Sequence, residues 1–217
     1  MSKPLIWVLI GFGFLFIFLG FINKQLLIFG LLLIGIGLFA GLGPDGILRK
    51  DQVWDTWATL IENAKGYAEN IFQDTESFIA HSQAPFLKIE RREMAPGMIK
   101  GMMGNNRHFL VVTDQENSRL KPFQIFINSR DYGICLDVSW HLTFRPNLFQ
   151  AFCSLIPFVN IVPKTISDLD LFDEQDLRVY TTNIHHCLLQ SVTILMLGFN
   201  QDPSKLDRRS KGFLGIS

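Results

Sequence analysis

Residues 134–144 read ICLDVSWHLTF, and apolar and polar side chains alternate along this whole stretch. One set is entirely apolar: Ile134, Leu136, Val138, Trp140, Leu142 and Phe144. The other set is Cys135, Asp137, Ser139, His141 and Thr143. Successive side chains of a β-strand point to opposite faces, so the alternation predicts a strand with one buried and one polar face. Such strands are typical of antiparallel sheets.

Three further stretches, 87–92, 108–114 and 123–128, carry the same signal as alternation or as a short apolar run. Together with 134–144 they predict an antiparallel sheet of about four strands. A long helix is expected before the sheet, because apolar residues recur near a period of 3.6 across residues 52–83. Another is expected after it, beginning near Asp173 or Asp176, with one apolar face. That face comprises Leu177, Tyr180, Ile184, Cys187, Leu188 and Leu195. These elements make an α+β domain with helices packed on one face of the sheet.

The N-terminal part of the chain has a different character. Residues 4–22 and 26–42 are apolar runs without a charged side chain, separated only by Asn-Lys-Gln. A helix needs roughly 20 apolar residues to cross a hydrocarbon core, so residues 1–43 are predicted to form a two-helix transmembrane hairpin. The alternative for the first run is a cleaved signal peptide preceded by Lys3, but a small-residue cleavage site is lacking.

The flanking charges predict the orientation of this hairpin. Lys3, Arg49 and Lys50 lie on one side of it, whereas the turn carries only Lys24. By the positive-inside rule both termini are expected in the cytoplasm, which predicts a multi-pass protein of the inner membrane with the lipid bilayer as a partner. Gly37 and Gly41 form a small-xxx-small face, which predicts a homo-oligomer or, alternatively, packing within one hairpin.

Domain organisation follows from the helix-breaking sequence Gly-Pro-Asp-Gly at 43–46. We expect the hairpin over 1–43, a cytoplasmic α+β domain over 44–199 and a C-terminal tail over 200–217. The formal net charge of the chain is +0, so no global electrostatic attraction to duplex nucleic acid is expected.

Motifs for catalysis are missing from the sequence. It has no Walker sequence, nucleophile elbow, HExxH or paired CxxC, so we predict no enzyme and no cofactor. Asp137, Ser139 and His141 share one strand face, but same-face neighbours lie about 6.6 Å apart, too far for a nucleophile and its base. The favoured interpretation is a polar face of the sheet whose side chains form ordinary hydrogen bonds and have no catalytic role.

Metal ligation is also not expected. Consecutive helical residues such as His185, His186 and Cys187 point about 100° apart and cannot jointly hold one ion. The three cysteines, Cys135, Cys153 and Cys187, are widely spaced among apolar neighbours, which indicates buried, reduced thiols.

The candidate ligand site is the basic, glycine-bearing segment 91–108, which we call the basic loop. Its candidate ligand-binding residues are Arg91, Arg92, Lys100, Asn105, Asn106, Arg107 and His108. Such a segment can offer backbone N–H groups beside positive charge to a small anion or nucleotide. The alternative is a solvated connection between two strands.

An apolar hairpin followed by one small domain with a basic loop such as 100–108 resembles the small membrane effectors of bacterial antiphage systems, including those of type III CRISPR. The resemblance implies binding of a cyclic-oligonucleotide messenger, a change in hairpin association and a role in antiviral defence. The leading hypothesis is therefore a membrane-anchored sensor of an anionic ligand. The alternatives are a membrane-anchored scaffolding protein that recruits a protein partner, and a tethered hydrolase using Asp137 and His141.

Overall fold

The computed structural model describes residues 11–13, 15, 28, 30–31, 50–94, 107–117, 119–145, 169–212 and 214–216. The chain divides into two compact units, Met1–Gly46 with Asn147–Phe149, and Ile47–Pro146 with Gln150–Ser217. The second unit contains every strand that the structure describes.

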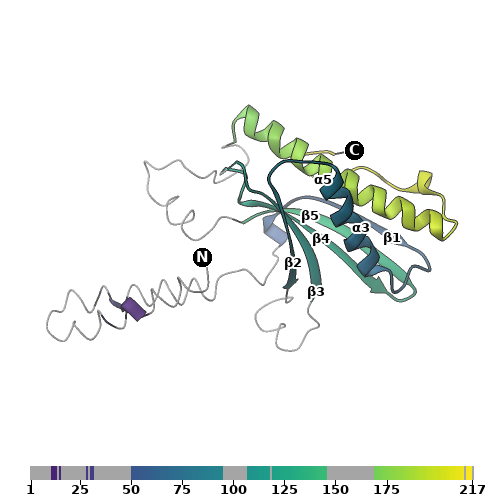
Figure 1. Cartoon of the computed structure of the whole chain (residues 1–217), viewed down its shortest axis with the longest axis horizontal. Helices are drawn as coiled ribbons and strands as arrows, with labels where there is room; N and C mark the ends of the chain where they lie inside the picture. The colour runs from purple at the N-terminus through teal and green to yellow at the C-terminus, as the bar shows by residue number, and fades with distance from the viewer. Residues whose placement is uncertain are drawn as a thin grey trace. The chain divides into compact units, whose positions relative to one another are not determined.

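The second unit is built on a five-stranded antiparallel sheet with the order β1-β5-β4-β3-β2 (Figure 1). Its strands are β1 (Val53–Ile61), β2 (Leu87–Met94), β3 (Arg107–Asp114), β4 (Phe123–Tyr132) and β5 (Cys135–Phe144). The helices are α3 (Ala68–His81) and α5 (Leu171–Gly198), with short 3-10 turns η2 (Lys50–Gln52) and η5 (Pro203–Lys205). The first and last strands along the chain, β1 and β5, are neighbours, and β1 and β2 form the two edges.

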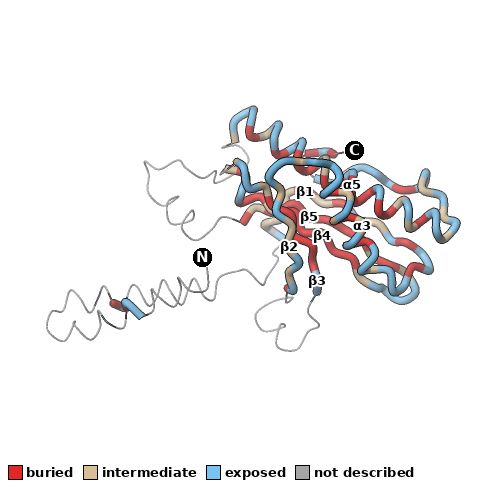
Figure 2. The backbone as a smooth tube through the Cα atoms, in the orientation of Figure 1, coloured by how far each residue is buried: buried red, intermediate tan, exposed pale blue. Residues whose placement is uncertain are grey.

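The main core lies between the sheet and the two helices (Figure 2). From β5 it receives Leu136, Val138, Trp140 and Leu142, which confirms the face predicted for residues 134–144. Ile134 is the exception: it lies in the β4–β5 turn and is 67% exposed. The strand therefore begins one residue later, at Cys135.

The central strand β4 is apolar on both faces. Phe123, Ile125 and Ile127 join the main core, while Phe126 joins a smaller apolar cluster on the opposite face. The other members of that cluster are Met94, Phe109 and Val111. Burial of both faces explains why this segment reads as an apolar run with few charges.

The predicted helix over residues 52–83 is wrong in its first half. Residues 53–61 form strand β1, so the sheet has five strands and not about four. The sequence VWDTWATLI is rich in aromatic and β-branched residues, which favour strands. Trp57 and Ile61 fit a helical period as well as a strand period of two, and both are buried against the helices.

The last helix agrees with its predicted apolar face and starts slightly earlier than expected. Asp170 is its N-cap and accepts a hydrogen bond from the Asp173 backbone N–H at 2.9 Å. Leu177, Tyr180 and Ile184 are all buried in the main core. The helix thus covers the sheet with the face that the sequence predicts.

The predicted transmembrane hairpin, and with it the multi-pass location, is contradicted. Within the described residues, none of the helices combines the length and the apolar character needed to cross a membrane. An apolar run of sufficient length is necessary for a span but does not by itself establish a continuous helix. Of residues 1–43 only 11–13, 15, 28 and 30–31 are described, and Gly37 and Gly41 lie outside them.

Candidate functional site

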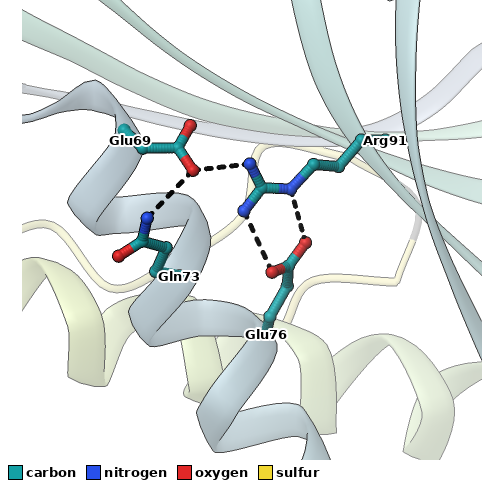
Figure 3. A network of polar contacts seen from close by, with 4 residues as sticks. All are labelled: Glu69, Gln73, Glu76 and Arg91. Atoms are coloured by element: carbon teal, nitrogen blue, oxygen red, sulfur yellow. Dashed lines mark hydrogen bonds and ion pairs between the residues drawn. The ribbon is translucent and has the colours of Figure 1, made fainter.

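Arg91 of the predicted basic loop is already paired (Figure 3). Its guanidinium donates two hydrogen bonds to Glu76, from Nε at 2.8 Å and from Nη2 at 3.0 Å. It donates a third to Glu69 Oε1 at 2.5 Å, and Gln73 donates to the same oxygen. The hydrogen bonds from Arg91 lower the pKa of Glu69, and those to Glu76 and Glu69 raise the pKa of Arg91. Arg91 therefore joins β2 to α3.

The other basic-loop residues do not converge on one site in the described part of the chain. Arg92 pairs with Glu90, which also pairs with Lys88, so its charge is compensated on β2. Arg107 and His108 are exposed at the start of β3, where they stand opposite Met94 and Glu93 in register. The remaining candidates, Lys100, Asn105 and Asn106, lie outside the described residues.

We expect Arg91→Ala to lower the free energy of unfolding by about 1 kcal/mol, because exposed ion pairs contribute about 0.2 to 1 kcal/mol and the bidentate geometry with Glu76 favours the upper end of that range. The Arg91 side chain is 47% exposed, so added salt should reduce the difference further. Urea denaturation at low and high salt checks this. Arg107→Ala is the control and should leave stability unchanged; a loss of several kcal/mol for Arg91→Ala would contradict the assignment.

Asp137 and His141, the residues of the hydrolase hypothesis, are engaged with different partners. Arg130 Nε donates to Asp137 Oδ2 at 2.8 Å. The Thr56 hydroxyl donates to the Trp140 carbonyl, so the 2.8 Å contact between Thr56 Oγ1 and His141 requires an N–H at His141 Nδ1. Burial lowers the pKa of His141, and the charge of Asp137 opposes this shift.

Ser139 shares that face but is not joined to His141 by any hydrogen bond in the part of the chain that the structure describes. The face therefore lacks the nucleophile–base contact that covalent catalysis requires.

The segment 185–187 does not gather ligands for a metal. His185 and Cys187 are buried in α5, and His186 is exposed. Among the described residues no group of three or more His, Cys, Asp or Glu side chains is placed to hold a metal ion. Cys135 and Cys187 are free thiols, and burial raises the pKa of Cys187. Cys153 lies outside the described residues.

Three open hollows follow one another along one side of α5. The first holds about 870 Å³ between the α3–β2 connection, the β3–β4 turn and α5. The second, about 530 Å³, lies between α3 and α5, and the third, about 450 Å³, lies beside Arg208. Ser82 and Asn183 line both of the first two, and His186 and Gln190 line both of the last two. We call this row of three adjoining hollows the α5 groove.

The lining of the α5 groove mixes polar and apolar side chains and follows one face of the helix. Its α5 residues recur every three or four positions: Asp176, Val179, Tyr180, Asn183, His186, Cys187, Gln190, Thr193 and Ile194, with Leu189 at the third hollow. Amide side chains such as Asn183 and Gln190 carry both donors and acceptors. They are therefore suited to a ligand that presents both kinds of group, as a polypeptide backbone does.

One end of the groove is acidic. Asp114, Glu116 and Asp176 line the first hollow, and none of its lining residues is basic. Asp114 Oδ1 accepts from the Glu116 N–H at 2.7 Å, whereas Glu116 and Asp176 are exposed and form no ion pair among the described residues. The opposite end carries His186 and Arg208. The groove is therefore polarised from negative to positive.

The walls at the acidic end are fixed by hydrogen bonds. Asn183 Nδ2 donates to Ser82 Oγ at 3.1 Å, and the Gln115 N–H donates to the Phe86 carbonyl at 3.0 Å. Gln83, which lines the hollow, has a φ of 53°, an uncommon value for a residue other than glycine. Backbone in such conformations is often found where a ligand site is held in shape.

The sequence prediction missed this groove, because its residues come from four separate segments. The only sequence signal was the polar stripe of α5 at helical spacing, which is also what a solvated helix face would show. The chain matches no protein-family model, no curated protein and no solved structure. The resemblance to antiphage effectors thus stays a prediction.

Proposed function

We propose that this chain is a protein-recruitment module that binds an extended segment of a partner polypeptide in the α5 groove. The observation that carries the proposal is the succession of three adjoining hollows along one helix face, with amide side chains between an acidic and a basic end. Of the functions predicted from the sequence, this corresponds to recruitment of a protein partner.

The length of the groove suggests the length of the bound segment. Residues 176–193 of α5 cover about 26 Å at about 1.5 Å per residue. An extended chain rises about 3.3 Å per residue, so the groove spans about eight residues. A small molecule is less well suited, because such ligands prefer enclosed pockets and the three hollows are open to solvent.

The charge distribution suggests the direction of the segment. A lysine, arginine or N-terminal amine of the partner would lie at Glu116 and Asp176, and an acidic group would lie near His186 and Arg208. Charge complementarity of this kind fixes register and suppresses wrong partners.

A fluorescence-anisotropy titration of the full chain tests the proposal. The probes are labelled octapeptides with a single lysine or arginine placed at each position of a serine-valine background. We expect binding that depends on the position of the basic residue. Binding that is indifferent to that position, or no binding, would contradict a polarised peptide groove.

Asp176→Asn should weaken binding of the best octapeptide by about tenfold, because a hydrogen bond to a charged group contributes about 1.5 to 3 kcal/mol and the site is open to water. The matched control is Glu174→Gln, which also removes one carboxylate from α5 but lines none of the hollows. We expect less than a twofold change for it. Equal effects of the two variants would indicate general electrostatic attraction only.

Anion sensing by the basic loop stays a prediction. Of the candidate anion-binding residues that the structure describes, Arg107 and His108 are exposed. Anion sensing can be distinguished from peptide recruitment by titration with linear and cyclic oligonucleotides, with the affinities of the wild type and Arg107→Ala compared.

A further inference from the structure

Residues 206–212 and 214–216 lie against the edge of the sheet at β1, and we call them the strap. The Lys211 N–H donates to the Thr56 carbonyl at 2.7 Å, which extends the hydrogen bonding of the edge strand. Leu206, Leu214 and Ile216 are buried in the main core. Where Gly212 passes β1, an added Cβ would lie 2.4 Å from the Asp55 Cα. The strap therefore closes one edge of the sheet.

Two aromatic side chains hold the first part of the strap through its backbone carbonyls. Trp57 Nε1 donates to the Asp207 carbonyl at 2.6 Å, and His185 Nε2 lies 2.7 Å from the Arg208 carbonyl. Arg208 also lines the third hollow of the α5 groove. Movement of the strap would therefore change the basic end of the groove.

The hydrogen bonds of His185 define its protonation state. Trp140 Nε1 lies 2.8 Å from His185 Nδ1, and an indole N–H can only donate, so Nδ1 must carry a lone pair. A carbonyl oxygen can only accept, so Nε2 must carry the proton that is donated to the Arg208 backbone carbonyl. The ring is thus neutral, and it is fully buried between Trp57 and Trp140, at centroid distances of 5.5 and 5.7 Å.

We propose that His185 is a proton-controlled latch, which holds the strap closed when neutral and releases it when a second proton binds at Nδ1. A proton there would point at the Trp140 N–H, which leaves two donors facing each other. The closed strap, which the His185 Nε2–H holds through the Arg208 carbonyl, would also keep water away from the charged imidazolium ring. Opening the strap hydrates the charged ring, so protonation favours the open form.

The groups around the ring have opposing effects. Burial lowers the pKa of His185; the hydrogen bond to the Arg208 carbonyl raises it, the charge of His186 lowers it and that of Asp55 raises it, with burial dominant. From strand β5, the side chain that contacts the His185 ring is the uncharged Trp140. Since the pKa is depressed in the closed form, the closed strap is most favoured above the ordinary histidine value of about 6.5 and becomes progressively less favoured as the pH falls below it.

Hydrogen exchange measured by NMR on the full chain tests the latch, with rates divided by the intrinsic exchange rate at each pH. Each unit of difference in pKa between the two forms changes their ratio tenfold. We expect protection of the Lys211 and Leu214 amides to fall severalfold, by up to about tenfold, between about pH 7.5 and 5.5, while the Ile127 amide of β4 keeps its protection. Constant protection at Lys211 and Leu214, or loss of protection at Ile127 in step with them, would overturn the proposal.

Two variants and one direct observation complete the test. His185→Gln keeps an acceptor and a donor without a titrating ring, so its strap protection should change less than about twofold over the same range. His81→Gln, which removes an exposed histidine from the end of α3, is the control and should behave as the wild type. If His185→Gln does not fold, the ¹⁵N shifts of His185 in the wild type decide. Titration of Nδ1 in step with the loss of Lys211 protection supports the latch, and titration out of step, or an Nδ1–H tautomer near neutral pH, overturns it.

Discussion

Ile127→Ala is expected to lower the free energy of unfolding by about 2 to 5 kcal/mol, the range for loss of a large aliphatic side chain from a core. Ile127 is fully buried on the central strand β4. In register it lies between Leu110 of β3 and Trp140 of β5, which are also fully or almost fully buried. The surrounding strands are paired on both sides and cannot collapse readily into the space left behind. Urea denaturation with an unchanged m-value measures the loss.

Ile134→Ala is the matched control, because it removes the same atoms from a residue that is 67% exposed in the β4–β5 turn. We expect a change of less than about 0.5 kcal/mol. If the two substitutions had equal effects, the assignment of Ile127 to the core and of Ile134 to the surface would be wrong.

Asp55→Ala is expected to lower the free energy of unfolding by about 2 to 4 kcal/mol. Asp55 is 1% exposed, and its Oδ2 accepts from Ser210 Oγ at 3.0 Å and from the Leu214 N–H at 3.1 Å. Its Oδ1 accepts from the Thr56 N–H at 2.7 Å. Removing the acceptor leaves buried donors without partners, and each such group costs about 1 to 3 kcal/mol. Chemical denaturation measures the loss.

Asp207→Ala is the control for this second prediction. Asp207 is exposed, and its side chain accepts only from the nearby Arg209 N–H at 3.1 Å among the described residues. Its carbonyl, which binds Trp57, is unaffected by the change. We expect a loss below about 1 kcal/mol, and a loss as large as that of Asp55→Ala would mean that Asp55 does not anchor the strap.

Strands β2 to β5 could be predicted from the sequence because each buries one face and exposes the other, or lies centrally with both faces buried. The alternation of residues 134–144 predicted the side chains that β5 places in the core. Ile134 broke the pattern because a turn, and not the strand, sets its direction. Strand β1 was missed because Trp57 and Ile61 satisfy both periods, and only pairing with β5, distant in sequence, decides between them.

The candidate site was harder to predict from the sequence than the fold. Clustered positive charge suggested Arg91 and Arg92 as ligand residues, but the sequence does not reveal that Glu69, Glu76 and Glu90 neutralise them. The α5 groove depends on α3, the α3–β2 connection and the β3–β4 turn meeting beside α5. Such proximity between distant segments leaves no local pattern. The N-terminal apolar runs show the converse case, where a strong local pattern led to a contradicted prediction.

The most direct test of peptide recruitment is an NMR titration of the ¹⁵N-labelled full chain with the octapeptide that binds best. The account predicts that amide shifts concentrate along the groove, at residues 82–84, 114–117 and 176–194, with a spin label on the basic end of the peptide broadening Glu116 and Asp176 most. Shifts confined to Arg107 and His108, or spread without preference over the domain, would contradict the α5 groove as the binding site.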